Sequence, residues 1–134
     1  MRILIADDHP IVRKGVCTIL ESRNDLEVCA EATNGQEAIE KALQLKPDVV
    51  ILDVTMPYLD GFRAAKKIYE TLHVPILILS MHDGNEMVRL AASAGAKGFV
   101  NKNAISDCLL TAVDTVAAGG TFFPAANCNE VCLV

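Results

Sequence analysis

The sequence has no run of lysine and arginine residues, and its 12 basic side chains face 17 acidic ones, which gives a net charge of −5. A segment with this charge is a poor candidate for holding nucleic acid by electrostatics alone. No apolar stretch approaches the roughly 18 residues that a membrane span requires. The start, MRILIADD, also lacks the pattern of a signal peptide. We therefore expect an intracellular, cytoplasmic protein.

Cysteine pairs with the spacing of metal ligands are also missing. The chain has five cysteines, and no two of them form a CxxC arrangement. The odd number and the spacing favour buried free thiols in a reducing compartment. What the chain has in abundance is material for a core, because 51% of its 134 residues are hydrophobic. This composition excludes disorder over most of the length and predicts one domain.

Short apolar runs alternate with longer amphipathic ones along the chain. Continuous runs of Ile, Leu and Val are typical of strands in a parallel sheet that is covered on both faces. The expected strands are 2–6, 49–52 and 76–79, with weaker candidates at 26–32 and 98–101. Apolar positions at helical spacing predict helices over 10–22, 34–45, 62–72, 85–94 and 106–118. This order predicts an α/β fold of parallel strands joined by right-handed helical crossovers.

Polar residues with chemical potential stand at the carboxyl ends of the expected strands. The first strand runs into Asp7 and Asp8, the third into Asp53, the fourth into Ser80, and the fifth into Asn101 and Lys102. Taken singly, each has an ordinary explanation as a cap, a turn former or a solvated side chain. In an open parallel sheet, however, these ends meet at one edge, where ligands bind. We therefore expect the side chains to surround one shallow cleft.

The chemistry that needs this set of residues is phosphoryl transfer onto a carboxylate. Two unit charges ~4 Å apart repel by roughly 4 kcal/mol at an effective dielectric constant of 20, so three crowded carboxylates require a cation. Mg²⁺ suits oxygen ligands and would neutralise charge on an incoming phosphoryl group. Asp53 would be the nucleophile, while Lys102 and Ser80 would bind phosphoryl oxygens.

These residues and their surroundings resemble the receiver domain of two-component response regulators over about residues 1–120. The matching segments are Asp7-Asp8, the VVILD run ending in Asp53, the MPxxDG segment 56–61, Ser80, and GFVNK ending in Lys102. The stretch ADDHPIVRKG, together with AAGGTFF just past the last helix, resembles the NarL/FixJ (LuxR-type) subfamily. The resemblance implies a flavodoxin-like, doubly wound (βα)5 fold with a five-stranded parallel sheet in the order 2-1-3-4-5.

The resemblance also implies roles for individual residues. Asp53 would accept a phosphoryl group from a sensor histidine kinase, and Asp7 and Asp8 would hold Mg²⁺ together with Asp53 and the backbone carbonyl of Thr55. Ser80 and Phe99 match the hydroxyl and aromatic switch positions, which reshape an output surface in the family. For Phe99, ordinary core packing is an equally good interpretation. The domain would not be an enzyme, beyond supporting its own Mg²⁺-dependent phosphorylation and dephosphorylation.

Two positions near the site depart from the expected pattern or are ambiguous. Receivers commonly have proline after the lysine, where this sequence has Asn103. A cis bond before a non-proline residue costs about 2.5–4 kcal/mol, so the sequence leaves the geometry of the Lys102–Asn103 peptide open. His9 could be read as a phosphohistidine or a metal ligand, but we interpret it as a first-turn loop residue.

Three other interpretations compete with a phosphorylated receiver. A phosphatase of the haloacid dehalogenase type needs DxDx[TV], and the second aspartate is missing from Asp53-Val54-Thr55. A flavodoxin-like cofactor binder needs a Ser/Thr/Gly-rich phosphate loop after the first strand, where DDHP stands instead. A receiver-like interaction module that is never phosphorylated is excluded only by an assay.

The βα pattern is complete by about residue 120, and residues 121–134 differ in character. We expect a receiver domain over 1–120 and a C-terminal tail or the start of a linker over 121–134. Members of the subfamily usually carry a C-terminal helix-turn-helix that binds DNA, and we expect any such segment to lie outside this chain. Transcription regulation through it is the first expectation, and a stand-alone receiver that acts through protein–protein contacts is the alternative. The cognate kinase, signal, target genes, phosphate lifetime and oligomeric state, including dimer formation on phosphorylation, stay open.

Overall fold

The computed structural model describes residues 1–81, 84–124 and 131–133. Its strands are β1 (Arg2–Ala6), β2 (Glu27–Ala32), β3 (Val49–Asp53), β4 (Ile76–Ser80), β5 (Gly98–Asn101), β6 (Phe122–Pro124) and β7 (Val131–Leu133). Its helices are α1 (Pro10–Glu21), α2 (Gly35–Leu45), α3 (Gly61–Leu72), α4 (Asn85–Ser93), the short 3₁₀ helix η1 (Lys102–Ala104) and α5 (Ile105–Ala117). The ten predicted elements are confirmed, and each predicted end falls within one residue of the observed one.

The described strands form one sheet in the order β2-β1-β3-β4-β5-β6-β7. All neighbours from β2 to β6 pair in parallel, which confirms the predicted order 2-1-3-4-5 and the flavodoxin-like, doubly wound fold. Two short strands extend this sheet within the predicted tail. β6 pairs with β5 through Gly98 and Phe122 only, and β7 returns antiparallel to β6. Residues 125–130 and 134 of the predicted tail lie outside the described residues.

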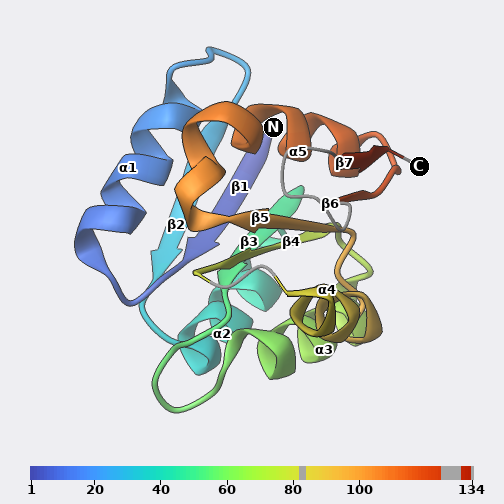
Figure 1. Cartoon of the computed structure of the whole chain (residues 1–134). Coiled ribbons are helices and arrows are strands. Elements are labelled where there is room, and N and C mark those ends of the chain that lie inside the picture. The colour runs from blue at the N-terminus through green and yellow to red at the C-terminus, as the bar shows by residue number, and fades with distance from the viewer. Residues whose placement is uncertain (82–83, 125–130, 134) are drawn as a thin grey trace.

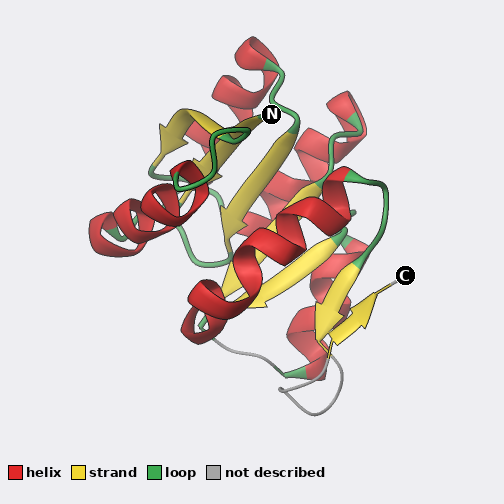
Figure 2. Ribbon diagram, turned by 90° about the horizontal axis from the view of Figure 1, so that it is seen from above, coloured by secondary structure: helices red, strands yellow, loops and turns green. Residues whose placement is uncertain are grey.

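The sheet separates two hydrophobic cores, because successive side chains of a strand point to opposite faces. In β1, Leu4 contributes to the core beneath α2, α3 and α4, whereas Ile3 and Ile5 pack toward α1 and α5. Figure 1 shows this arrangement, with α1 and α5 above the sheet and α2, α3 and α4 below it. The view from above shows the helices covering both faces (Figure 2). Strands β3 and β4 are buried along their whole length, as their continuous apolar runs predict.

Side-chain caps fix where two of the helices begin. Asn34 accepts a hydrogen bond from the backbone N–H of Glu37 at the start of α2, and Asp60 accepts one from Arg63 at the start of α3. Such caps satisfy N–H groups that have no partner within the helix. Helix α1 has Pro10 at its first position, where a missing N–H costs nothing. None of the described helices is long and apolar enough to span a membrane.

Three of the five cysteines predicted to be buried free thiols have described side chains, and these three are free but half-buried rather than fully buried. Cys17, Cys29 and Cys108 form no disulfide. Burial raises the pKa of the Cys17 thiol to about 11 and also raises that of Cys29, with nearby carboxylates adding to the shift at Cys17. Both thiols are therefore protonated and unreactive near neutral pH. Cys128 lies outside the described residues.

The amino-terminal edge of the sheet is closed by polar contacts of the chain's first residues. The amino group of Met1 donates a hydrogen bond to the backbone oxygen of Asp25 at 2.7 Å. The backbone N–H of Arg2 donates to Asp48 Oδ2 at 2.7 Å, and its guanidinium donates to the carbonyl oxygen of Leu45 at 2.6 Å. Charged groups at this edge therefore have partners that fasten β1 to the turns before β2 and β3.

Gly61, the first residue of α3, lies against the backbone at the end of β3. Its N–H donates a hydrogen bond to the carbonyl oxygen of Val54 at 2.8 Å. A Cβ atom at this position would lie 2.0 Å from the carbonyl oxygen of Asp53, far closer than van der Waals contact allows. Because the obstacle is backbone, it cannot rotate away. The glycine therefore sets how closely α3 approaches the strand that carries Asp53.

We expect Gly61→Ala to lower the free energy of unfolding by about 2 kcal/mol or more, because the added methyl group forces β3 and α3 apart. The matched control is Gly15→Ala in α1, where no described atom lies within 4 Å of the added Cβ. That change should raise the free energy of unfolding by up to about 1 kcal/mol through helix propensity. Urea unfolding of both variants measures the two effects, and equal responses would contradict the close approach at Gly61.

Candidate functional site

The polar residues predicted at the strand ends meet at one edge of the sheet. Asp53 ends β3 and Ser80 ends β4, while Asp7 directly follows β1 and Lys102 directly follows β5. The register places Ser80 opposite Asn101 and Leu52 opposite Ala6, so these ends are level with one another. Strand β1 lies between β2 and β3, which makes the β1–β3 boundary the point where the strand order reverses. Open α/β sheets bind ligands at this point.

The Lys102 ammonium group joins two buried carboxylates across this edge. Its Nζ lies 3.0 Å from Asp7 Oδ2 and 3.1 Å from Asp53 Oδ1. The side chains of all three residues are at least 96% buried, so water screens these charges little. Lys102 engages only one oxygen of each carboxylate. The other oxygen of each, Asp7 Oδ1 and Asp53 Oδ2, faces a different neighbour.

That neighbour is His9, which the sequence analysis placed in a first-turn loop. His9 is the N-cap residue of α1, as that interpretation requires, but its ring lies within the acidic cluster. Its Nδ1 atom lies 2.9 Å from Asp7 Oδ1, 3.2 Å from Asp8 Oδ1 and 3.7 Å from Asp53 Oδ2. The one sequence feature that pointed to His9 as part of the cluster was its position directly after the acidic pair. The sequence could not show that its ring turns back toward that pair.

Backbone contacts hold the acidic pair in place at the end of β1. The N–H of Asp7 donates to the carbonyl oxygen of Ala32 at 3.0 Å, which continues the β1–β2 pairing by one residue. Asp7 Oδ1 accepts the N–H of His9 at 2.8 Å, and the Arg13 guanidinium donates to the Asp7 carbonyl oxygen at 2.7 Å. The turn from β1 into α1 is therefore fixed from both sides, and Asp7 is fully buried.

A small pocket of about 220 Å³ opens beside the cluster. Eight residues line it: His9, Asp53, Val54, Thr55, Ser80, Met81, Met87 and Lys102. Ser80 is 1% exposed, and Thr55 is exposed at the pocket rim. The structure thus brings the predicted residues Asp53, Thr55, Ser80 and Lys102 to one pocket. Asp7 and Asp8 lie beside it, within the same group of carboxylates.

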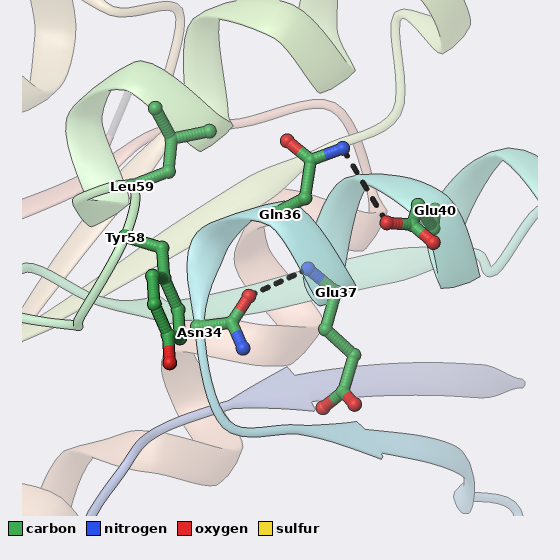
Figure 3. A pocket seen from close by; sticks show the side chains of 6 residues that line it. All are labelled: Asn34, Gln36, Glu37, Glu40, Tyr58 and Leu59. Atoms are coloured by element: carbon green, nitrogen blue, oxygen red, sulfur yellow. Dashed lines mark hydrogen bonds between the residues drawn. The ribbon is translucent and has the colours of Figure 1, made fainter.

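A larger open hollow of about 500 Å³ lies away from this cluster, between the start of α2 and the loop before α3. Figure 3 shows its lining side chains, with Tyr58 and Leu59 on one side and the first turns of α2 on the other. The polar groups here are engaged in local structure. Asn34 caps α2 through the Glu37 N–H, and Gln36 donates to Glu40 at 3.4 Å. This hollow therefore lacks the convergent, uncompensated charge of the acidic cluster.

Comparison with known proteins identifies the family to which this fold belongs. The response regulator receiver domain family matches residues 3–114, which include every element from β1 to the greater part of α5. The chain belongs to this family. Within it, the likeness to NarL- and LuxR-type regulators described below confirms the NarL/FixJ subfamily that the sequence suggested.

Among curated proteins, the oxygen regulatory protein NreC of Staphylococcus haemolyticus (strain JCSC1435) is 45% identical over 124 residues. That match covers 91% of this chain and 57% of NreC, so the chain spans little more than half the length of such relatives. Two solved structures superpose with TM-scores of 0.84. One is a two-component response regulator of the LuxR family from Aurantimonas sp. SI85-9A1, 37% identical, with 88% of this chain and 85% of that chain covered. The other is the signal receiver domain of the putative response regulator NarL from Mycobacterium tuberculosis, 34% identical, with 88% and 96% covered.

The acidic cluster of this receiver domain could hold a metal ion. One ligand atom from each of Asp7, Asp8, His9 and Asp53 lies within 4.8 Å of all the others. Asp53 Oδ2 is buried and accepts no hydrogen bond from any described residue. If the imidazole is neutral, three carboxylates and one ammonium group leave two negative charges unbalanced. A divalent cation is the ligand that this charge and these donor atoms suit.

The predicted switch residue Phe99 lies inside the core of this receiver domain. It is 1% exposed and packs among the residues beneath α3 and α4, including Ala91 and Ala96. It lies opposite Ile78 in the β4–β5 pairing, two residues before the Ser80–Asn101 pair at the pocket. Its position satisfies the core-packing interpretation, and a switch role stays a prediction.

The turn after β5 forms without a proline. Asn101 Oδ1 accepts the N–H of Asn103 at 2.8 Å, and this contact starts the 3₁₀ helix η1. Among the described residues no peptide bond is cis, so the Lys102–Asn103 peptide is trans. Lys102 therefore reaches the two carboxylates from a turn that a side-chain amide holds in place.

The Asp53 carboxyl is hard to ionise in this environment. Burial raises its pKa, and the negative charge of Asp7 raises it further. Lys102 and the backbone N–H of Thr55 act in the opposite direction, but the balance places the pKa of Asp53 at about 6. Near neutral pH the group is ionised at a cost in folding free energy, which binding of a cation would offset.

We expect this cost to appear as a pH dependence of stability in the metal-free protein. Because the pKa is raised in the folded state, the Asp53 contribution favours folding at low pH and is lost as the pH rises through about 6. Between pH 5 and 7.5 the stability of the wild type should fall by about 1.4 kcal/mol relative to Asp53→Asn. Urea unfolding with a chelator present measures the difference, and a constant difference across this range would contradict the raised pKa.

Proposed function

We propose that Asp53 of this receiver domain accepts a phosphoryl group from a sensor histidine kinase. The observation that carries the proposal is the position of Asp53, a buried carboxylate at the end of the central strand. It is paired with Lys102 and opens onto a pocket. A carboxylate oxygen attacks the phosphorus of a phosphohistidine, the P–N bond breaks, and its electron pair stays on the imidazole nitrogen. The product is an aspartyl phosphate on Asp53.

Lys102 and Ser80 would stabilise the transferred group. The Lys102 ammonium already lies 3.1 Å from Asp53 Oδ1, so it needs little movement to neutralise charge on a phosphoryl oxygen. The Ser80 hydroxyl lines the same pocket from the neighbouring strand and can donate a hydrogen bond to another oxygen. Both residues sit at strand ends, which fixes their backbones relative to Asp53.

Mg²⁺ is the cation that we propose for this reaction. Asp7, Asp8 and Asp53 supply the hard oxygen ligands it prefers, and the backbone carbonyl of Thr55 at the pocket rim is the fourth proposed ligand. When bound, the ion would neutralise charge on the incoming phosphoryl group. The two unbalanced negative charges of the cluster and the orphaned Asp53 Oδ2 support this choice.

Phosphorylation would act through the surface next to the pocket. Ser80 ends β4 immediately before the segment that leads to α4, and Phe99 lies in the adjacent strand under that helix. Added charge at this edge can bias the position of such a segment. We propose that Ser80 and Phe99 couple the phosphoryl group to an output surface, which changes pairing with a partner or with a second copy of the chain.

The output that we propose is transcription regulation through a DNA-binding segment outside this chain. A relative with 39% identity, from Bacillus subtilis (strain 168), is named transcriptional regulatory protein LnrK, and the match covers 57% of it. The net charge of −5 argues against DNA binding by this segment itself. We propose a cytoplasmic location and no catalysis beyond the domain's own phosphorylation and dephosphorylation. A stand-alone receiver acting through protein contacts is the alternative.

We expect Asp53→Asn to abolish labelling of the protein by acetyl phosphate and Mg²⁺, because it removes the nucleophile. Intact-mass measurement should show about one added phosphoryl group on the wild type and none on the variant. The matched control is Asp107→Asn, which removes an exposed carboxylate in the first turn of α5. It should label like the wild type. Equal labelling of wild type and Asp53→Asn would exclude Asp53 as the acceptor.

We expect Mg²⁺ to raise the free energy of unfolding through the acidic cluster. A ligand at a hundredfold excess over its dissociation constant stabilises the folded state by roughly 2.7 kcal/mol. Asp8→Asn should reduce this gain, because it removes one carboxylate ligand while leaving the Lys102 ion pairs intact. Thermal melting with and without Mg²⁺ gives the gain for wild type, Asp8→Asn and the control Asp107→Asn. The same gain in all three proteins would place the ion elsewhere.

A further inference from the structure

We propose that His9 is a metal ligand and that it gives this acidic cluster a preference for a borderline transition-metal ion, such as Zn²⁺, over Mg²⁺. The ion would bind His9 Nδ1 together with one oxygen each of Asp7, Asp8 and Asp53. The comparison with Mg²⁺ rests on the proposed Mg²⁺ site, whereas the Zn²⁺ site does not depend on it.

Two of the distances around His9 Nδ1 are close to those of atoms that share one metal ion, and the third is slightly longer. Ligand atoms ~2.1 Å from a common metal lie roughly 3.0 Å apart in octahedral geometry and roughly 3.4 Å apart in tetrahedral geometry. His9 Nδ1 lies 2.9 Å from Asp7 Oδ1, 3.2 Å from Asp8 Oδ1 and 3.7 Å from Asp53 Oδ2. The four atoms lie within 4.8 Å of one another, so the carboxylate oxygens could close around one ion at His9 Nδ1 by side-chain movement.

Hydrogen bonding alone explains this arrangement incompletely. A proton on His9 Nδ1 can serve the contact with Asp7 Oδ1, but one donor cannot satisfy three carboxylates. Asp53 Oδ2 is still without a hydrogen bond from any described residue, although Asp53 is 2% exposed. The Lys102 ammonium, which can only donate, lies 3.4 Å from the same imidazole nitrogen and would need it unprotonated. Neither tautomer satisfies all of these neighbours, whereas a bound cation satisfies the carboxylates together.

The two sides of the cluster are chemically distinct. Lys102 takes Asp7 Oδ2 and Asp53 Oδ1, so the oxygens that face His9 are the other two. An ion on the His9 side would bind the two oxygens that Lys102 does not contact, and the ammonium group, 3.4 Å from His9 Nδ1, would move away from that nitrogen. The His9 side chain is 54% exposed, which leaves a route for an ion to enter from solvent.

The donor set determines which ions this side favours. Mg²⁺ takes oxygen ligands and gains little from an imidazole, whereas Zn²⁺, Ni²⁺ and Cu²⁺ bind imidazole nitrogen well. Three carboxylates without a nitrogen ligand would suit Mg²⁺, the hard ion of this comparison. The added imidazole raises the affinity of the cluster for the borderline ions relative to Mg²⁺. Among the four proposed ligands, only His9 supplies a nitrogen.

Titration calorimetry with Zn²⁺ and with Mg²⁺, on the whole chain and without a phosphoryl donor, tests the proposal. His9→Ala should weaken Zn²⁺ binding by about tenfold or more and change Mg²⁺ binding by less than about threefold. His9→Ser should behave in the same way while keeping a residue that caps α1 well, so a folding defect in one variant does not decide the outcome. The matched control is His73→Ala at the end of α3, which should bind Zn²⁺ like the wild type.

Three outcomes would overturn the proposal. The first is unchanged Zn²⁺ affinity in both His9 variants. The second is an equal loss in the His73 control. The third is Zn²⁺ binding that saturating Mg²⁺ does not weaken, since the two ions share the carboxylates. If Mg²⁺ fails to bind, the role of the carboxylates is tested instead with Asp53→Asn. This variant lacks one of the proposed ligands and should bind Zn²⁺ more weakly. In that case the proposed Mg²⁺ site fails while the His9 site stands. Acetyl phosphate labelling reports separately on Asp53 as acceptor.

Discussion

The contact on which the site depends is the Lys102 ammonium group held between Asp7 and Asp53. At 3.0 and 3.1 Å, each attraction is of the order of 5 kcal/mol at an effective dielectric constant of 20. Without it, two buried carboxylates would face each other at the switch point of the sheet with no compensating charge. The attraction is still insufficient, because the pKa of Asp53 remains at about 6. Burial and the neighbouring Asp7 outweigh Lys102, so the cluster retains a demand for further positive charge.

Most of the fold was predictable because its physical signal is local. The strands β1, β3 and β4 are continuous apolar runs that become fully or almost fully buried, and only a doubly covered parallel sheet accommodates them. The edge strand β2 is half-buried and reads more weakly, as its pattern implies. The short strands β6 and β7 were not predicted. A strand of three residues is too short to show a periodic pattern. In addition, β6 pairs with β5, which is distant in the sequence, and β7 pairs with β6.

The site was predictable to the extent that strand ends determine it. Asp53, Ser80 and Lys102 reach one pocket because parallel strands deliver their carboxyl ends to one edge, and the position of each residue after its strand sufficed to show this. His9 was placed correctly at the start of α1, but its chemical surroundings were missed. The direction of its ring depends on the turn that Asp7 and Arg13 fix, and a sequence pattern does not contain side-chain direction.

The polar contacts of Met1 and Arg2 at the amino-terminal edge have a consequence for how such a domain can change over generations. There each charged group has a hydrogen-bond partner, and none of these residues lines the pocket at the other end of the strands. At the opposite edge Asp53 Oδ2 has no hydrogen bond among the described residues, so a substitution there changes both the charge offered to a ligand and the stability of the fold. Substitutions at the amino-terminal edge therefore act on folding, whereas those at the carboxyl edge act on folding and ligand binding together.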